Sequence, residues 1–133
     1  MLRILYILKQ LLILLQVSVD SGEYLTHRSA FFSHAQVLMN KLWFNTNLSE
    51  AVDKPRLHTQ LVPDQDVSYE KIPFDSSGKY SMSDDIIKGL KELGHNVTGS
   101  KSFAVVQAVY RDPKSKDIYA KSDPRKHGAP AGQ

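Results

Sequence analysis

The strongest constraint on the fold lies in the stretch SFAVVQAVY at residues 102–110, which is dense in strand-forming residues. Its alternation leaves both faces of the strand largely apolar, and such a strand is normally covered on both sides. After the turn RDPKSKD, the segment IYAKS at residues 118–122 can pair back antiparallel. We therefore expect a C-terminal hairpin inside a layered fold.

Helix and strand patterns precede this hairpin. Residues 30–43 place apolar side chains on one face at helical spacing, and residues 56–63 and 67–72 show shorter strand patterns. The clearest helix covers residues 83–94. The expected order is helix, strand, strand, helix, strand, strand and a polar tail, which is an α/β class.

Capping residues mark the ends of the predicted helices. Ser83 stands at the cap position of the clearest helix, and Gly94 supplies its C-terminal stop. A short helix is predicted just before Pro55, with either Asn47 or Ser49 as its N-terminal cap.

The N-terminal residues 1–19 differ from the rest of the chain because they are dense in Leu and Ile. As a helix they would carry a narrow polar stripe, and Lys9 and Gln10 interrupt the apolar run too early for a membrane span of about 20 residues. One interpretation is a signal peptide or signal anchor with Arg3 in its basic end. The other is an irregular extension.

Composition and charge narrow the function classes. The 133 residues are enough for at most one domain, and the absence of cysteine excludes disulfides and Cys-based zinc sites. The net charge of +3 is concentrated at the end, where residues 101–133 hold seven basic and three acidic side chains. Only Tyr110 and Tyr119 accompany those charges, so we predict a solvated face and no nucleic-acid site.

A search for catalytic motifs finds no P-loop, GxGxxG, HExxH or GxSxG pattern. Asp64 and Asp66 form a carboxylate pair that we interpret as solvated, and the histidines lack the spacing of metal ligands. We predict no cofactor and no metal site. The five histidines are His27, His34, His58, His95 and His127.

Two sequons for N-linked glycosylation are present, at Asn47 and at Asn96. They become meaningful if the chain enters the secretory route, and are otherwise ordinary turn and cap residues.

Three ordered segments resemble the C-terminal part of the small subunit of gamma-glutamyltransferases, also called glutathione hydrolases. They are LWFNTNLSEAVDKPRLHTQLVP at residues 42–63, FAVVQAVY at 103–110 and SDPRKHGAPAG at 122–132. The resemblance covers residues 35–133, leaving residues 20–34 as a linker that does not match. Positions of the family motifs are filled by Pro55, Arg56, His58, Gln60, Gln107, Ser122, Asp123, Arg125, Lys126 and Gly128.

The resemblance implies part of an α/β/β/α sandwich of the Ntn-hydrolase class and an extracellular, membrane-attached enzyme made as a self-cleaving proenzyme. In the family, the new N-terminal Thr of the small subunit attacks the gamma-glutamyl bond of glutathione, and its own amine serves as the base. The acyl group then passes to water or to an acceptor amino acid or peptide. The implied partners are the large subunit of the same proenzyme and glutathione or gamma-glutamyl peptides.

The sequence departs from the family where catalysis would occur. The nucleophilic Thr and the substrate-binding shell find no match, and the Gly-Gly pair expected near Thr26 and His27 is absent. We therefore expect a truncated, catalytically incomplete family chain without catalytic residues of its own. One alternative is a non-catalytic, light-chain-like protein that pairs with a full-length member, and another is an independent hydrolase using Thr26 or Ser29.

Overall fold

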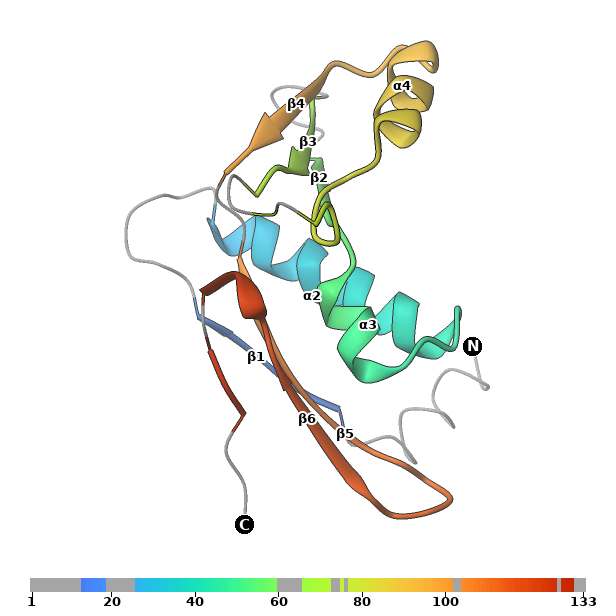
Figure 1. The fold of residues 1–133 in the computed structure, drawn as a ribbon, viewed down its shortest axis with the longest axis vertical. Coiled ribbons are helices and arrows are strands. Elements are labelled where there is room, and N and C mark those ends of the chain that lie inside the picture. Colours follow the sequence, from blue (N-terminus) through green and yellow to red (C-terminus); the bar gives the residue numbers. More distant parts are fainter. Residues whose placement is uncertain are drawn as a thin grey trace.

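The computed structural model describes residues 13–18, 26–59, 66–72, 75, 77–101, 104–126 and 128–130, with backbone only at 13–18, 26–30 and 126. Residues 1–12, and with them Arg3, Lys9 and Gln10 of the predicted signal, lie outside this part of the chain. The described elements form two small sheets with three helices and one 3₁₀ turn (Figure 1).

The first sheet has the strand order β1-β5-β6 and is antiparallel throughout. It comprises β1 (Ile13–Ser18), β5 (Val105–Arg111) and β6 (Ile118–Ser122). The pairing of β5 with β6, in which Gln107 lies opposite Ser122, confirms the predicted C-terminal hairpin.

The second sheet has the order β2-β3-β4 and mixes both strand directions. Its strands are β2 (Leu57–Thr59), β3 (Val67–Glu70) and β4 (Val97–Ser100). β2 runs antiparallel to β3, and β4 runs parallel to it. The four residues of β4 were not predicted, because Gly99 weakens the pattern and the pairing with β3 spans a whole helix in the sequence.

Two of the helices cover one face of the first sheet. α2 (Thr26–Leu42) and α3 (Leu48–Asp53) lie along β5 and β6 in Figure 1. The hydrophobic core between these two helices and the sheet contains Val37, Leu48, Ala51, Val52, Val106, Ala108 and Tyr110.

β5 has one buried and one open face, where the sequence predicted cover on both. Val106 is fully buried and Ala108 nearly so, whereas Gln107 is exposed and Val109 is 37% exposed. The predicted cover on both faces is therefore present only in part: the α2 and α3 side is buried along the strand, whereas on the other face Val105 is buried and the residues that follow it are exposed.

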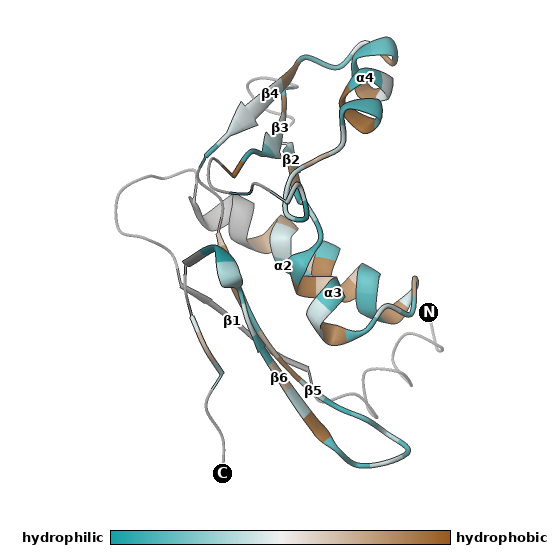
Figure 2. Ribbon diagram, in the orientation of Figure 1, coloured by the Kyte–Doolittle hydropathy of each residue, from teal (hydrophilic) through white to brown (hydrophobic). Residues whose placement is uncertain are grey.

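The third helix, α4 (Asp84–Glu92), lies at the end of the molecule beside β4 (Figure 1). Figure 2 shows that α4 carries both hydrophobic and hydrophilic residues, yet none of its residues is buried. Gly94 ends the helix with φ of 90°, a conformation that favours glycine. Ser83 occupies the N-terminal cap position, but its side chain makes no capping hydrogen bond.

Two expectations about the first third of the chain need correction. Residues 13–18 form a strand, although residues 1–19 were considered as a helix, because the backbone of β1 pairs with β5 along its whole length. α2 begins at Thr26, four residues before the predicted start at Ala30 and inside the expected linker 20–34.

Candidate functional site: a buried arginine and carboxylate network

Four charged residues from separate elements meet in the interior. Arg56 directly precedes β2, Glu70 ends β3, and Asp123 and Arg125 lie at the 3₁₀ turn η1 (Pro124–Lys126) that follows β6. Arg56 is 2% exposed, Glu70 and Asp123 are each 1% exposed, and Arg125 is 9% exposed. Buried charges of this kind persist only when they are paired and hydrogen-bonded.

Arg56 binds both carboxylates. Its Nε donates to Glu70 Oε2 at 3.2 Å and its Nη2 donates to Glu70 Oε1 at 2.8 Å, which is the bidentate fork geometry of strong pairs. The same Nη2 lies 3.1 Å from Asp123 Oδ2. Arg56 therefore links the second sheet to the segment that follows the first sheet.

Arg125 closes the C-terminal end of α3. Its Nη1 donates to the carbonyl oxygen of Val52 at 3.0 Å, and its Nη2 donates to those of Asp53 at 2.9 Å and Lys54 at 3.0 Å. These carbonyls have no partner within the helix, and the helix dipole favours a cation at this end. Pro55 directly follows and keeps the chain from continuing as a helix.

The guanidinium of Arg125 also contacts both acids. Its Nη1 donates to Asp123 Oδ1 at 3.0 Å. Its Nε lies 2.9 Å from Glu70 Oε1, close enough for an ion pair, although the hydrogen is not aligned for a hydrogen bond.

Asp123 joins the network to the backbone. Its Oδ2 accepts the N–H of Val106 at 3.2 Å, and its Oδ1 accepts the N–H of Arg125 at 3.1 Å. The first bond extends the β5–β6 ladder by a side chain where the paired strands end at Ser122. The carboxylate thus fixes the start of β5 and the shape of the 3₁₀ turn together.

A second carboxylate, Asp53, binds two lysines at the edge of the network. Its Oδ2 lies 2.7 Å from Lys79 Nζ, and its Oδ1 lies 3.2 Å from Lys121 Nζ. The hydrogen bond to Asp53 and the charge of that carboxylate raise the pKa of Lys79 above its usual value. Lys79 belongs to a loop in which Asp75 accepts hydrogen bonds from the side chains of Ser77 and Ser81.

The network is suited to holding elements together and not to bond chemistry. The two arginines balance the charges of Glu70 and Asp123, and no hydroxyl nucleophile is bonded to any of these groups in the described part of the chain. Within that part, Arg56 Nη1 and both ring nitrogens of His58 are buried without a hydrogen-bond partner. The His58 ring instead packs edge-on against Phe32, with centroids 5.4 Å apart.

The other predicted motif residues are dispersed around this network. Ser122 is buried, and Gly128 lies so close to it that a Cβ on the glycine would stand 3.1 Å from Ser122 Oγ. Gln107 is exposed on the open face of β5. The backbone of Lys126 is in η1, while its side chain and Gln60 lie outside the described part.

The two sequon asparagines differ in their surroundings. Asn47 caps α3, with its Oδ1 accepting the N–H of Glu50 at 2.8 Å, so Asn47 and not Ser49 is the cap. Asn96 donates from its Nδ2 to Asp66 Oδ1 at 2.9 Å. Asp66 is exposed, in line with the predicted solvated state, whereas Asp64 lies outside the described residues.

The described part of the molecule has neither a cluster of metal-ligating side chains nor a membrane-spanning helix. No three His, Asp or Glu side chains there are grouped to hold a metal ion. No helix there has the length and apolar character to cross a membrane.

Sequence reasoning missed Glu70, Asp53, Lys79 and Lys121 as members of the network. The sequence did contain a signal for Glu70. In the strand pattern, Ser68 and Glu70 point to one face, and Val67 and Tyr69 point to the other. That alternation puts a carboxylate on the same face as its neighbour Arg56, whose backbone oxygen accepts the Glu70 N–H at 3.0 Å. The contacts of Asp53 with two distant lysines have no local signal.

A family model described as Gamma-glutamyltranspeptidase matches residues 29–133. This match starts within α2 and includes the whole network.

Two curated proteins are similar in sequence. Scoloptoxin SSD20 of Scolopendra dehaani is 31% identical over 94 residues, which make up 71% of this chain and 43% of that protein. Glutathione hydrolase 5 proenzyme of Homo sapiens is 35% identical over 99 residues, 74% of this chain and 15% of that protein. The chain therefore spans less than half the length of either relative.

Solved structures have the same fold. A mutant of gamma-glutamyltranspeptidase from Helicobacter pylori superposes with a TM-score of 0.66 at 27% identity, over 85% of this chain and 53% of that chain. This likeness supports the predicted fold class, an α/β arrangement of the Ntn-hydrolase type.

Proposed function

Because the chain belongs to the gamma-glutamyltranspeptidase family, we propose that its 133 residues form the C-terminal scaffold of the family's small subunit and are catalytically incomplete by themselves. In this proposal the reaction is cleavage of the gamma-glutamyl bond of glutathione, with transfer to water or to an acceptor amino acid or peptide. The nucleophile and the substrate-binding shell are supplied by residues other than these.

The buried network carries the proposal. Arg56, Asp123 and Arg125 were singled out by the family motifs, and their contacts are with each other, with Glu70 and with backbone. A charge-balanced, buried cluster of this kind orients the elements around it and offers no open position for a substrate. The role that fits is to hold the scaffold on which a neighbouring active site is built.

The hydroxyl groups near the expected oxyanion position do not suggest a nucleophile. Thr26 begins α2 and Ser29 lies in its first turn, so neither is the free terminal residue that an N-terminal nucleophile requires. An independent hydrolase using either residue is therefore disfavoured.

A second candidate, a non-catalytic protein that pairs with a full-length family member, is favoured by the open face of the first sheet. Val109 is 37% exposed and Ile118 is 69% exposed on that face. Apolar side chains gathered on an exposed sheet face are typical of a surface that a partner covers. For both candidates, we propose the family's location at the outer face of the plasma membrane.

The decisive measurement is turnover of a chromogenic gamma-glutamyl anilide by the purified chain, with a full-length family enzyme as positive control. We expect no turnover above the buffer blank. Release of the anilide that persists through purification and is lost in Thr26→Ala or Ser29→Ala would refute the proposal.

Co-expression with a full-length family enzyme separates the two candidates. A stable complex that co-purifies while the chain alone stays inactive supports the pairing protein. The scaffold proposal is supported by a different pair of results. In that case the chain does not co-purify, but a fusion that places the upstream residues of a family enzyme before it in one polypeptide is active.

A further inference from the structure

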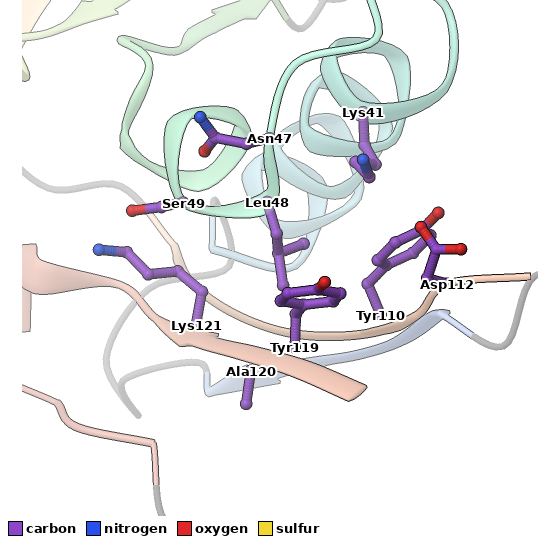
Figure 3. A pocket seen from close by; sticks show the side chains of 9 residues that line it. All are labelled: Lys41, Asn47, Leu48, Ser49, Tyr110, Asp112, Tyr119, Ala120 and Lys121. Carbon is purple, nitrogen blue, oxygen red and sulfur yellow. The ribbon is translucent and has the colours of Figure 1, made fainter. Parts of the chain in front are cut away.

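A shallow hollow of about 490 Å³ lies between the N-terminal end of α3 and the β5–β6 hairpin (Figure 3). Its rim carries Asn47 and Ser49, the first and last residues of one sequon, and its floor is built from Tyr110 and Tyr119. This hollow is open to solvent, and it meets the buried network only at Lys121, whose Nζ lies 3.2 Å from Asp53 Oδ1.

Asn47 is held in a conformation that leaves its amide nitrogen available. The residue is exposed and extended, with φ of −67° and ψ of 161°, and its Oδ1 alone makes the capping bond to Glu50. Its Nδ2 makes no hydrogen bond to a described residue, and Ser49 is exposed. By contrast, Nδ2 of Asn96 already donates to Asp66.

The floor of the hollow has the chemistry that binds a sugar ring. The rings of Tyr110 and Tyr119 are stacked with centroids 6.2 Å apart, and Tyr119 is 49% exposed. The C–H face of a pyranose packs on an aromatic ring in the same way as other apolar groups, while its hydroxyls need polar partners. Lys121 and Asp112 provide such partners at the edge of the hollow.

We propose that Asn47 carries an N-linked glycan whose first sugars lie in this hollow against Tyr119. The cap survives the modification, because the bond to Glu50 uses Oδ1 and the sugar replaces a hydrogen on Nδ2. This inference rests on the extracellular location included in the proposed function, and it does not depend on whether the chain is catalytically incomplete.

The chemical step requires a polyprenyl-diphosphate-linked oligosaccharide as donor. Asn47 Nδ2 attacks the anomeric carbon of the first sugar, so that a C–N bond forms and the anomeric C–O bond breaks. The polyprenyl diphosphate leaves with the bonding electrons, and a base of the transferase takes one proton from Nδ2.

The test expresses the full chain behind a cleavable secretion signal in eukaryotic cells, with Asn96→Gln in every variant so that only the Asn47 sequon remains. We expect one endoglycosidase-sensitive glycan on the parent and on Ser49→Thr. We expect none on Asn47→Asp, which keeps the cap, or on Ser49→Ala, which leaves Asn47 unchanged. A parent chain whose mass does not change on endoglycosidase treatment would overturn the proposal.

The position of the sugar is tested by the rate at which the endoglycosidase releases the glycan from the native chain. Tyr119→Ala should speed release several-fold, because the first sugar loses the ring that shelters it. Ile118→Ala is the matched control, since Ile118 faces the opposite side of the sheet and its loss should leave the rate unchanged. Equal rates in the parent and in Tyr119→Ala would rule out the hollow as the place of the sugar.

Discussion

At the scale of single residues, the buried network combines a large desolvation penalty for its charges with strong ion pairing between them. Arg56 and Arg125 share Glu70, so that one carboxylate compensates charge on two guanidinium groups. Removing one member of such a group leaves an uncompensated buried charge, whereas an exposed pair loses little. The backbone carbonyls bound by Arg125 add a local function, the capping of α3.

The substitution Glu70→Gln should destabilise the chain by about 3–5 kcal/mol, because two buried arginines are then left with Asp123 as their shared carboxylate and one positive charge is uncompensated. The control is Glu50→Gln, whose 3.4 Å contact with Lys54 is exposed. That variant should change stability by less than about 1 kcal/mol. Urea unfolding followed by far-ultraviolet circular dichroism at low protein concentration measures both. Equal effects of the two substitutions would show that the network contributes no more than a surface pair.

At the scale of elements, α4 shows how a strong local pattern can form a helix without burying it. Ile86 is 50% exposed, and Leu93, just beyond the last turn, is 78% exposed. The stability of α4 must therefore come largely from its intrinsic propensity and its ends. Two glycines have opposite effects on the stability of α4. Gly89 lies within the helix, where a side chain would have open space, whereas Gly94 follows the helix and adopts φ of 90°, which favours glycine.

Alanine at these two glycines should have opposite effects on α4. Gly89→Ala should stabilise the helix by roughly 0.5–1 kcal/mol, because glycine loses more backbone entropy. Gly94→Ala should destabilise it by roughly 1 kcal/mol, because an L-residue is strained in the left-handed region. Amide hydrogen exchange over residues 84–92 reports both. A shift in the same direction for both variants would contradict this account of the helix.

At the scale of the whole molecule, the first sheet is the layer whose exposure sets the behaviour of the isolated chain. α2 and α3 cover one face, and the other presents Val109 and Ile118. In the proposed scaffold that open face meets the remainder of an α/β/β/α sandwich. The isolated chain should therefore aggregate through it.

Replacing the two exposed side chains together, by Val109→Thr and Ile118→Thr, should raise the soluble fraction of the isolated chain several-fold. Val106→Thr is the control, because Val106 is fully buried on the covered face and its substitution should lower solubility by destabilising the core. Sedimentation at fixed concentration measures the soluble fraction. A parent chain that stays monomeric and melts in one sharp transition would count against the exposed-face account.

Local patterns by themselves determined the hairpin, the C-terminal stop of α4 at Gly94 and the helix break at Pro55, and they narrowed the cap of α3 to Asn47 or Ser49. These features depend on neighbours within a few residues, where turn, cap and alternation rules act. The order of the motifs around Arg56, Ala108 and Asp123 also indicated the family, which the comparison with known proteins then supported.

Only the tertiary structure decided which charges pair and which faces stay open. Glu70 and Arg125 are distant in sequence, and the pairing of β4 with β3 and of β1 with β5 likewise joins separated segments. The physical reason is that a strand pattern states which side chains share a face but not which element covers that face. Burial and ion pairing depend on how these distant segments pack, and no local pattern contains that information.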